Sequence, residues 1–91
     1  MVVSNRNRTI AIVIRHDGKS VSLVPMRGGK LSAEHLPHGQ FVQEWQETPY
    51  PLAEALALFQ HHVLQQGASQ EVIKGLGRLE QRDRCVVASL F

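Results

Sequence analysis

Histidine is the residue type that first points to possible chemistry, because the 91 residues contain five of them. Neutral imidazole is a good ligand for Zn²⁺, and structural zinc sites usually have four nitrogen, sulfur or oxygen ligands. His35 and His38 are separated by two residues, whereas the adjacent His61 and His62 would point about 100° apart on a helix. Neither H-E-x-x-H nor C-x-x-C occurs, so we predict no metal site and no cofactor.

The nucleophiles and acids of the sequence are typical of a protein that is not an enzyme. Cys85 is the only cysteine and lies in an apolar segment, where a thiol usually packs rather than reacts. No motif places a serine, a histidine and an acid together, and no complete glycine-rich phosphate-binding motif occurs. The spacing of Glu44, Glu47 and Glu54 does not distinguish them from ordinary surface charges. We therefore predict no catalytic residue.

Positive charge is concentrated at the start of the chain. Residues 1–30 contain six cations and one acid, a net charge of +5, while residues 31–66 contain four acids and no cation. Residues 67–91 add four cations and three acids, which brings the total to +2. A basic surface of this kind can contact the phosphates of a nucleic acid, and a solvated surface is the alternative interpretation. The residues of this candidate basic patch are Arg6, Arg8, Arg15, Lys19, Arg27 and Lys30.

A β-hairpin is the element that would position these cations. Residues 9–15 and 21–24 are rich in β-branched side chains, and Asp17-Gly18 between them is typical of a two-residue type I′ turn. This turn pairs Ile14 with Val21 and Ile12 with Leu23, and it places all four on one core face. Residues 1–8 precede the hairpin and are expected to form a flexible basic arm.

Further strands are expected on both sides of a helical region. Residues 30–36 are either a short strand or an irregular connection, and residues 40–46 are expected to be a strand with Phe41 and Trp45 on one face. Residues 84–91 are apolar on both faces and are expected to form a closing C-terminal strand.

Two helices lie between these strands in the sequence. The first has Thr48 as its expected N-cap and Gly67 as its end, and its apolar residues repeat at helical spacing: Leu52, Ala55, Leu56, Phe59 and Val63. The second begins after Ser69 as N-cap and carries Val72, Leu76 and Leu79 on one face. Gly75 and Gly77 each weaken this second helix, which therefore either breaks early or needs a packed neighbour.

The elements together predict one α+β domain spanning residues 1–91. Its sheet is small and mostly antiparallel, made of the N-terminal hairpin, one or two further strands and the C-terminal strand. The two helices pack on one face of this sheet.

Binding rather than catalysis is the function that this architecture favours. The sheet has apolar residues on both faces, so we expect a small non-catalytic binding or regulatory module that forms a homodimer through its apolar sheet surface or binds another protein. In the alternative, residues 25–40 cover the second face. A nucleic-acid-associated accessory protein is the second functional interpretation, and a small-ligand binder with a pocket between Trp45 and Phe59 is the third.

The sequence also predicts a cytoplasmic protein without a membrane partner. No apolar run approaches the roughly 20 residues that span a bilayer. Polar residues 5–8 interrupt the first apolar stretch, which excludes the pattern of a signal peptide.

One segment resembles a known family. Residues 61–78, HHVLQQGASQEVIKGLGR, are similar to a helical stretch of tyrosine recombinases. The resemblance covers less than a quarter of the chain, no arginine follows the histidines at the family's spacing, and the only tyrosine, Tyr50, lies upstream. It therefore implies no function for this protein.

Overall fold

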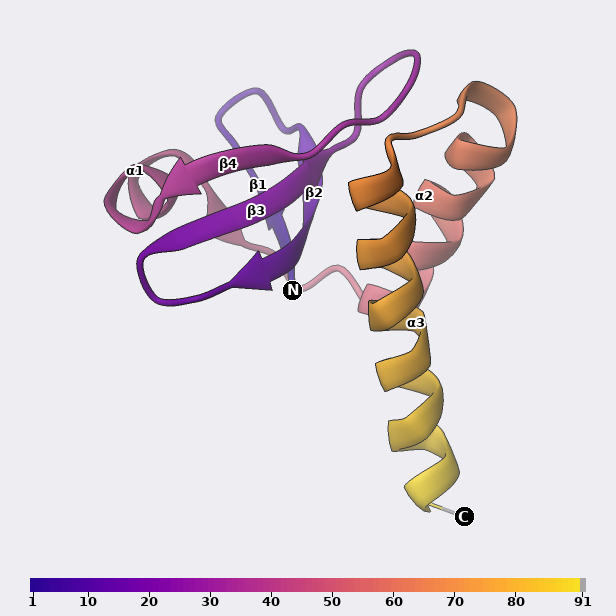
Figure 1. The fold of residues 1–91 in the computed structure, drawn as a ribbon. Helices are drawn as coiled ribbons and strands as arrows, with labels where there is room; N and C mark the ends of the chain where they lie inside the picture. The colour runs from indigo at the N-terminus through magenta and orange to yellow at the C-terminus, as the bar shows by residue number, and fades with distance from the viewer. Residues whose placement is uncertain (91) are drawn as a thin grey trace.

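Four strands precede the first helix, and all five strands form one curled antiparallel sheet beside the two long helices (Figure 1). The computed structural model describes the backbone of residues 1–90 and the side chains of residues 1–82. The strands are β1 (Val2–Ser4), β2 (Ile10–His16), β3 (Ser20–Pro25), β4 (Glu34–Pro37) and β5 (Gln46–Glu47), in the spatial order β4-β3-β2-β1-β5. The helices are α1 (His38–Glu44), α2 (Leu52–Gln66) and α3 (Gln70–Leu90). The predicted α+β class is confirmed.

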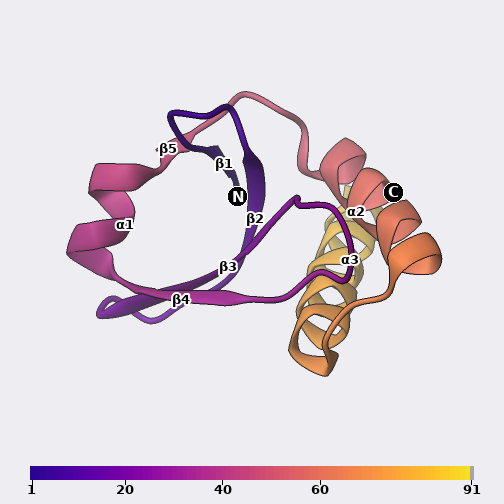
Figure 2. The same cartoon turned by 90° about the horizontal axis from the view of Figure 1, so that it is seen from above.

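The sheet separates two hydrophobic cores. Figure 2 shows that the sheet is strongly curved, with α1 on its concave side and α2 and α3 against its convex side at β2. The outer core, between the sheet and the two long helices, contains Val2, Ile12, Ile14, Val24, Leu31, Ala55, Leu56, Phe59, Val72, Leu76 and Leu79. The inner core, under α1, contains Val3, Ala11, Val13, Val21, Leu23, Phe41 and Trp45. Helices therefore cover both faces of the sheet.

The predicted N-terminal hairpin is confirmed, but its predicted turn and register are wrong. His16 pairs with Val21 and Val13 pairs with Leu23, with a β-bulge between Val13 and Arg15. Gly18 has a φ of 87°, but Asp17 lacks the positive φ that a type I′ turn requires. A shift of one residue moves a side chain to the other face. Val21 and Leu23 therefore lie in the inner core, while Ile12 and Ile14 lie in the outer core.

Residues 2–4 are not part of a flexible arm, as the sequence led us to expect for residues 1–8. They form β1, which lies between β2 and β5 in the sheet and pairs with both. The side chains of Val2 and Val3 are buried. The side-chain oxygen of Asn5 accepts hydrogen bonds from the backbone N–H groups of Asn7 and Thr9, at 3.0 and 2.9 Å. The cationic residues that follow β1 therefore belong to an ordered turn.

Residues 40–46, expected to be a strand, lie mostly in α1. Phe41 and Trp45 are four residues apart, a spacing that puts two side chains on one face of a strand and equally on one face of a helix. Both side chains are buried in the inner core. The segment at residues 30–36 combines the two alternatives, because Leu31 forms an isolated bridge with Ala68 and β4 begins three residues later.

The two predicted helices are confirmed in α2 and α3, with corrections at their ends. Helix α2 buries the expected face but begins after Pro51 rather than Thr48, and it ends at Gly67 with a φ of 84°. The hydroxyl of Ser69 accepts a hydrogen bond from the backbone N–H of Val72, as the predicted N-cap should. Helix α3 passes through both glycines without a break.

The predicted C-terminal strand is wrong, because the backbone from residue 84 to residue 90 continues α3. This end of α3 extends beyond the sheet in Figure 1. The side chains of Cys85 and of residues 86–91 lie outside the described residues.

Candidate functional site

Two hollows open at opposite ends of the curled sheet, and Trp45 lines both. One hollow lies beside the β1–β2 turn and the chain that follows β3. The other lies where β2 ends and α1 begins. The indole is only 5% exposed, so it forms part of the inner core and contributes to the base of each hollow.

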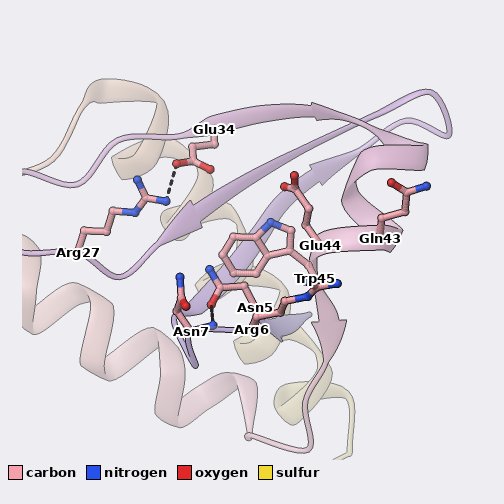
Figure 3. A pocket seen from close by; sticks show the side chains of 8 residues that line it. All are labelled: Asn5, Arg6, Asn7, Arg27, Glu34, Gln43, Glu44 and Trp45. Carbon is pink, nitrogen blue, oxygen red and sulfur yellow. Dashed lines mark hydrogen bonds and ion pairs between the residues drawn. The ribbon is translucent and has the colours of Figure 1, made fainter.

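The polar hollow, with a volume of about 420 Å³, is shown in Figure 3. Its side chains surround the Trp45 indole and come from the β1–β2 turn, from both ends of the β3–β4 connection and from α1: Asn5, Arg6, Asn7, Arg27, Glu34, Gln43 and Glu44. Nη2 of Arg27 lies 2.9 Å from Oε1 of Glu34. Two arginines and two glutamates balance in charge, so this hollow has no excess attraction for an anion.

The apolar hollow is larger, with a volume of about 610 Å³. Its base consists of buried side chains of the sheet and of α1, namely Val3, Val13, Phe41 and Trp45. Val42 of α1 is 55% exposed at the same hollow, and Leu79 of α3 lines its far wall. Four elements distant in the sequence therefore enclose one apolar surface.

The rim of the apolar hollow is polar, with more arginines than carboxylates among its described side chains. It carries Arg15 and His16 from the end of β2, His38 from the start of α1, Arg82 from α3 and Glu47 from β5. Nε2 of His16 lies 3.2 Å from Nδ1 of His38, with the two rings edge to face. Burial lowers the pKa of the Met1 amino group at this hollow, and the charge of Glu47 opposes that shift.

A serine, a histidine and an acid meet elsewhere, a combination that no sequence motif indicated. Nδ1 of His35 lies 2.9 Å from Oγ of Ser22, and Nε2 of the same ring lies 3.1 Å from Oε1 of Glu71. Ser22 is only 7% exposed and lines neither of the two hollows. These contacts form a polar link from β3 through β4 to α3, and they give the buried hydroxyl of Ser22 a hydrogen-bond partner. Because the three residues are distant in sequence, only the β3–β4 register and the start of α3 bring them together.

No family model matches this chain, and neither the curated proteins nor the solved structures contain a significant match. The residues of the hollows are therefore the basis for any functional proposal.

The structure divides the six cations that the sequence analysis grouped into one patch. Arg6 and Arg27 lie at the polar hollow and Arg15 at the apolar hollow. Arg8 lines a third, smaller hollow beside Tyr50. Lys19 lies in the β2–β3 turn, and Lys30 lies in the loop before β4. The patch is thus spread over both ends of the hairpin.

The predicted pocket between Trp45 and Phe59 does not form. Trp45 lies in the inner core and Phe59 in the outer core, on opposite faces of the sheet. Trp45 instead shares the polar hollow with Arg6 and Arg27. Arg82 is a site residue that the sequence did not indicate, because no sequence pattern places it at the same hollow as Arg15.

Two further predictions concern metals and membranes. Among the side chains of residues 1–82, no three or more His, Cys, Asp or Glu residues are grouped to hold a metal ion. None of the helices, over the described residues, combines the length and hydrophobicity that crossing a bilayer requires.

Proposed function

We propose that this protein is a small non-catalytic binding module that holds a small apolar molecule in the apolar hollow. One observation carries the proposal: a concave apolar surface of about 610 Å³ with a few polar groups at its rim. Ligand sites in proteins typically have volumes of about 300 to 1,000 Å³, apolar walls and a small number of placed polar groups. This proposal retains the third functional interpretation of the sequence with a different set of residues.

The arrangement of polar residues supports binding over catalysis. A nucleophile must reach the substrate, but the Ser22 hydroxyl is almost fully buried and is already within hydrogen-bonding distance of His35. The rim of the apolar hollow has no serine, threonine or cysteine among its described residues.

The two other interpretations have less support. The homodimer was expected because one face of the sheet would be left uncovered, yet Phe41 and Trp45 of the α1 region fill that face. Nucleic-acid binding was expected from a single basic patch, yet its cations are spread and Arg27 pairs with Glu34. Self-association and nucleic-acid contact stay predictions that experiments can test.

Titration with 1-octanol, a neutral apolar probe, tests the proposed function. Trp45 is the only tryptophan, so its fluorescence reports on the base of the hollow directly. We expect saturable binding, with amide NMR shifts confined to the elements that line the hollow, namely β1, β2, α1, β5 and the middle of α3. Val42→Gln should weaken binding about fivefold, because it removes apolar contact worth about 1 kcal/mol.

Ile73→Gln is the matched control for this titration. Ile73 is also partly exposed, at 44% against 55% for Val42, but it lies on α3 away from the apolar hollow. Octanol should bind this variant as it binds the wild type. Non-saturable fluorescence changes, or equal losses in both variants, would show that the hollow is not a binding site.

A further inference from the structure

The cationic rim of the apolar hollow identifies the chemical class of its ligand, provided that the proposed function holds. Arg15 and Arg82 reach this hollow from β2 and α3. We infer that the ligand is an amphipathic monoanion, with an apolar body on the Trp45 and Phe41 surface and a carboxylate between the two guanidinium groups.

Neither arginine has an acidic partner among the side chains that the structure describes. Among the described side chains, neither has a carboxylate within 4.0 Å, in contrast to Arg27. Asp17 is near enough for the charge of Arg15 to lower its pKa, but its oxygens already accept hydrogen bonds from Lys19 and Ser20. Guanidinium groups at an apolar surface are well placed to form charge-assisted hydrogen bonds with a carboxylate.

The charges of the rim fit a monoanion. Among the described side chains, Arg15 and Arg82 outnumber the single carboxylate of Glu47, and the Met1 amino group lies near that same carboxylate. One negative charge on the ligand would be matched by the two arginines, whereas a second would approach Glu47. The His16 and His38 rings lie on the same rim and can donate or accept a hydrogen bond without changing this balance.

The apolar base determines how such a ligand is oriented. Val13, Phe41 and Trp45 offer no side-chain charge, and a carboxylate buried among them would lose its hydration without compensation. The hydrocarbon body therefore enters the hollow, and the carboxylate stays at the rim between Arg15 and Arg82.

Octanoate and 1-octanol have the same hydrocarbon chain and differ in head group, so their comparison tests the inference. Trp45 fluorescence titrations of the full chain should show octanoate binding about tenfold more tightly than 1-octanol. Arg15→Gln and Arg82→Gln should each weaken octanoate binding about fivefold, as expected for loss of one partly exposed ion pair, and change octanol binding less than twofold. Added salt should weaken octanoate binding alone.

Arg78→Gln is the control for the loss of a charge from α3. Arg78 lies on the same helix but lines a separate hollow with Lys74, so its loss should leave both affinities unchanged. An equal loss of octanoate binding in Arg78→Gln would mean that general positive charge, rather than the rim, attracts the anion, and would overturn the inference.

Other outcomes distinguish the inference from the proposed function. Equal affinities for octanoate and octanol, unaffected by the arginine variants, would overturn the inference and leave the proposed function intact. Binding of neither probe would overturn both. Concentration-dependent dimerisation that Val42→Gln abolishes, without probe binding, would assign the hollow to a second copy of the chain and also overturn both.

Discussion

Asp17 orders the β2–β3 turn through its carboxylate. Its oxygens accept hydrogen bonds from the backbone N–H groups of Lys19 and Ser20, at 2.9 and 2.8 Å. These bonds lower the pKa of Asp17 below its ordinary value of 3.8, and the bond from Ser20 contributes most to this shift. A carboxylate that is favoured in the folded state stabilises the fold above its unfolded pKa, and this contribution is lost as the pH falls through the lowered folded value.

Asp17→Asn tests this dependence on pH. The variant keeps a side-chain acceptor but loses the charge, so it should unfold at a lower urea concentration than the wild type at pH 7. The difference should shrink as the pH falls below 3.8, since the wild-type carboxylate then takes up its proton. Urea midpoints of both proteins across this range give the measurement. A difference that does not vary with pH would mean that the charge makes no contribution.

Phe59 anchors α2 in the outer core, where its side chain is fully buried. Phe59→Ala should lower the free energy of unfolding by about 3 to 5 kcal/mol, because it leaves a cavity between α2 and the sheet. Gln60, on the same helix, is half-buried and donates a hydrogen bond to Glu80 at 2.7 Å. It is therefore an unsuitable control.

Gln65→Ala is the better control, because Gln65 is exposed on the same helix. It should change the free energy of unfolding by less than about 0.5 kcal/mol. Chemical denaturation of the two variants measures both values. Similar midpoints for Phe59→Ala and Gln65→Ala would contradict the packing of α2.

Helix α3 packs closely on β2 at Gly75. A Cβ placed there would lie 2.9 Å from Cβ and Cδ1 of Ile14, a contact too short for real side chains, whereas a Cβ at Gly77 would meet nothing within 4 Å. Glycine in a helix interior costs about 1 kcal/mol relative to alanine. The close packing of α3 on the bulged part of β2 therefore depends on Gly75 and not on Gly77.

Alanine substitutions at Gly75 and at Gly77 should change the free energy of unfolding in opposite directions. Gly77→Ala should raise the free energy of unfolding by up to about 1 kcal/mol, through helix propensity alone. Gly75→Ala should lower it by about 1 to 2 kcal/mol, because the steric cost of overpacking against Ile14 exceeds that gain. Thermal or urea unfolding compares them directly. Stabilisation by both substitutions would show that α3 does not pack closely on β2.

Positive charge is distributed over both ends of the molecule rather than on one face. Arg6 lies at the polar hollow before β2, and Lys19 lies in the turn after it. The seven residues of β2 between them span roughly 20 Å. A compact contact with a nucleic acid would therefore involve one end of the hairpin and not the other.

Salt-dependent binding to single- and double-stranded probes tests that contact. If the β1–β2 turn binds phosphate, Arg6→Ala should reduce the slope of log K against log salt by about 1, while Lys19→Ala should leave it unchanged. An equal effect of both variants would indicate diffuse attraction by the whole molecule. No mobility shift at low salt would exclude nucleic acid as a partner.

Local sequence was sufficient for the elements whose residues interact with near neighbours. Leu56 and Phe59 repeat at helical spacing, Gly67 takes up the positive φ that ends α2, and Ser69 accepts the hydrogen bond that begins α3. The hairpin at residues 10–25 follows equally from two β-branched runs around Asp17-Gly18. These signals are sufficient because capping, turn formation and amphipathic spacing act over four residues or fewer.

Tertiary contacts decided the features that local patterns leave ambiguous. Phe41 and Trp45 fit a strand or a helix equally, and the helix forms where both side chains can fill the concave face of the sheet. The bulge at Ile14 moved Val21 and Leu23 to that same face. The apolar hollow depends on these placements, and on α3 continuing far enough for Arg82 to line the same hollow as Arg15. Burial against distant elements determined each of these features, and the free energy of such burial depends on partners that no local segment contains.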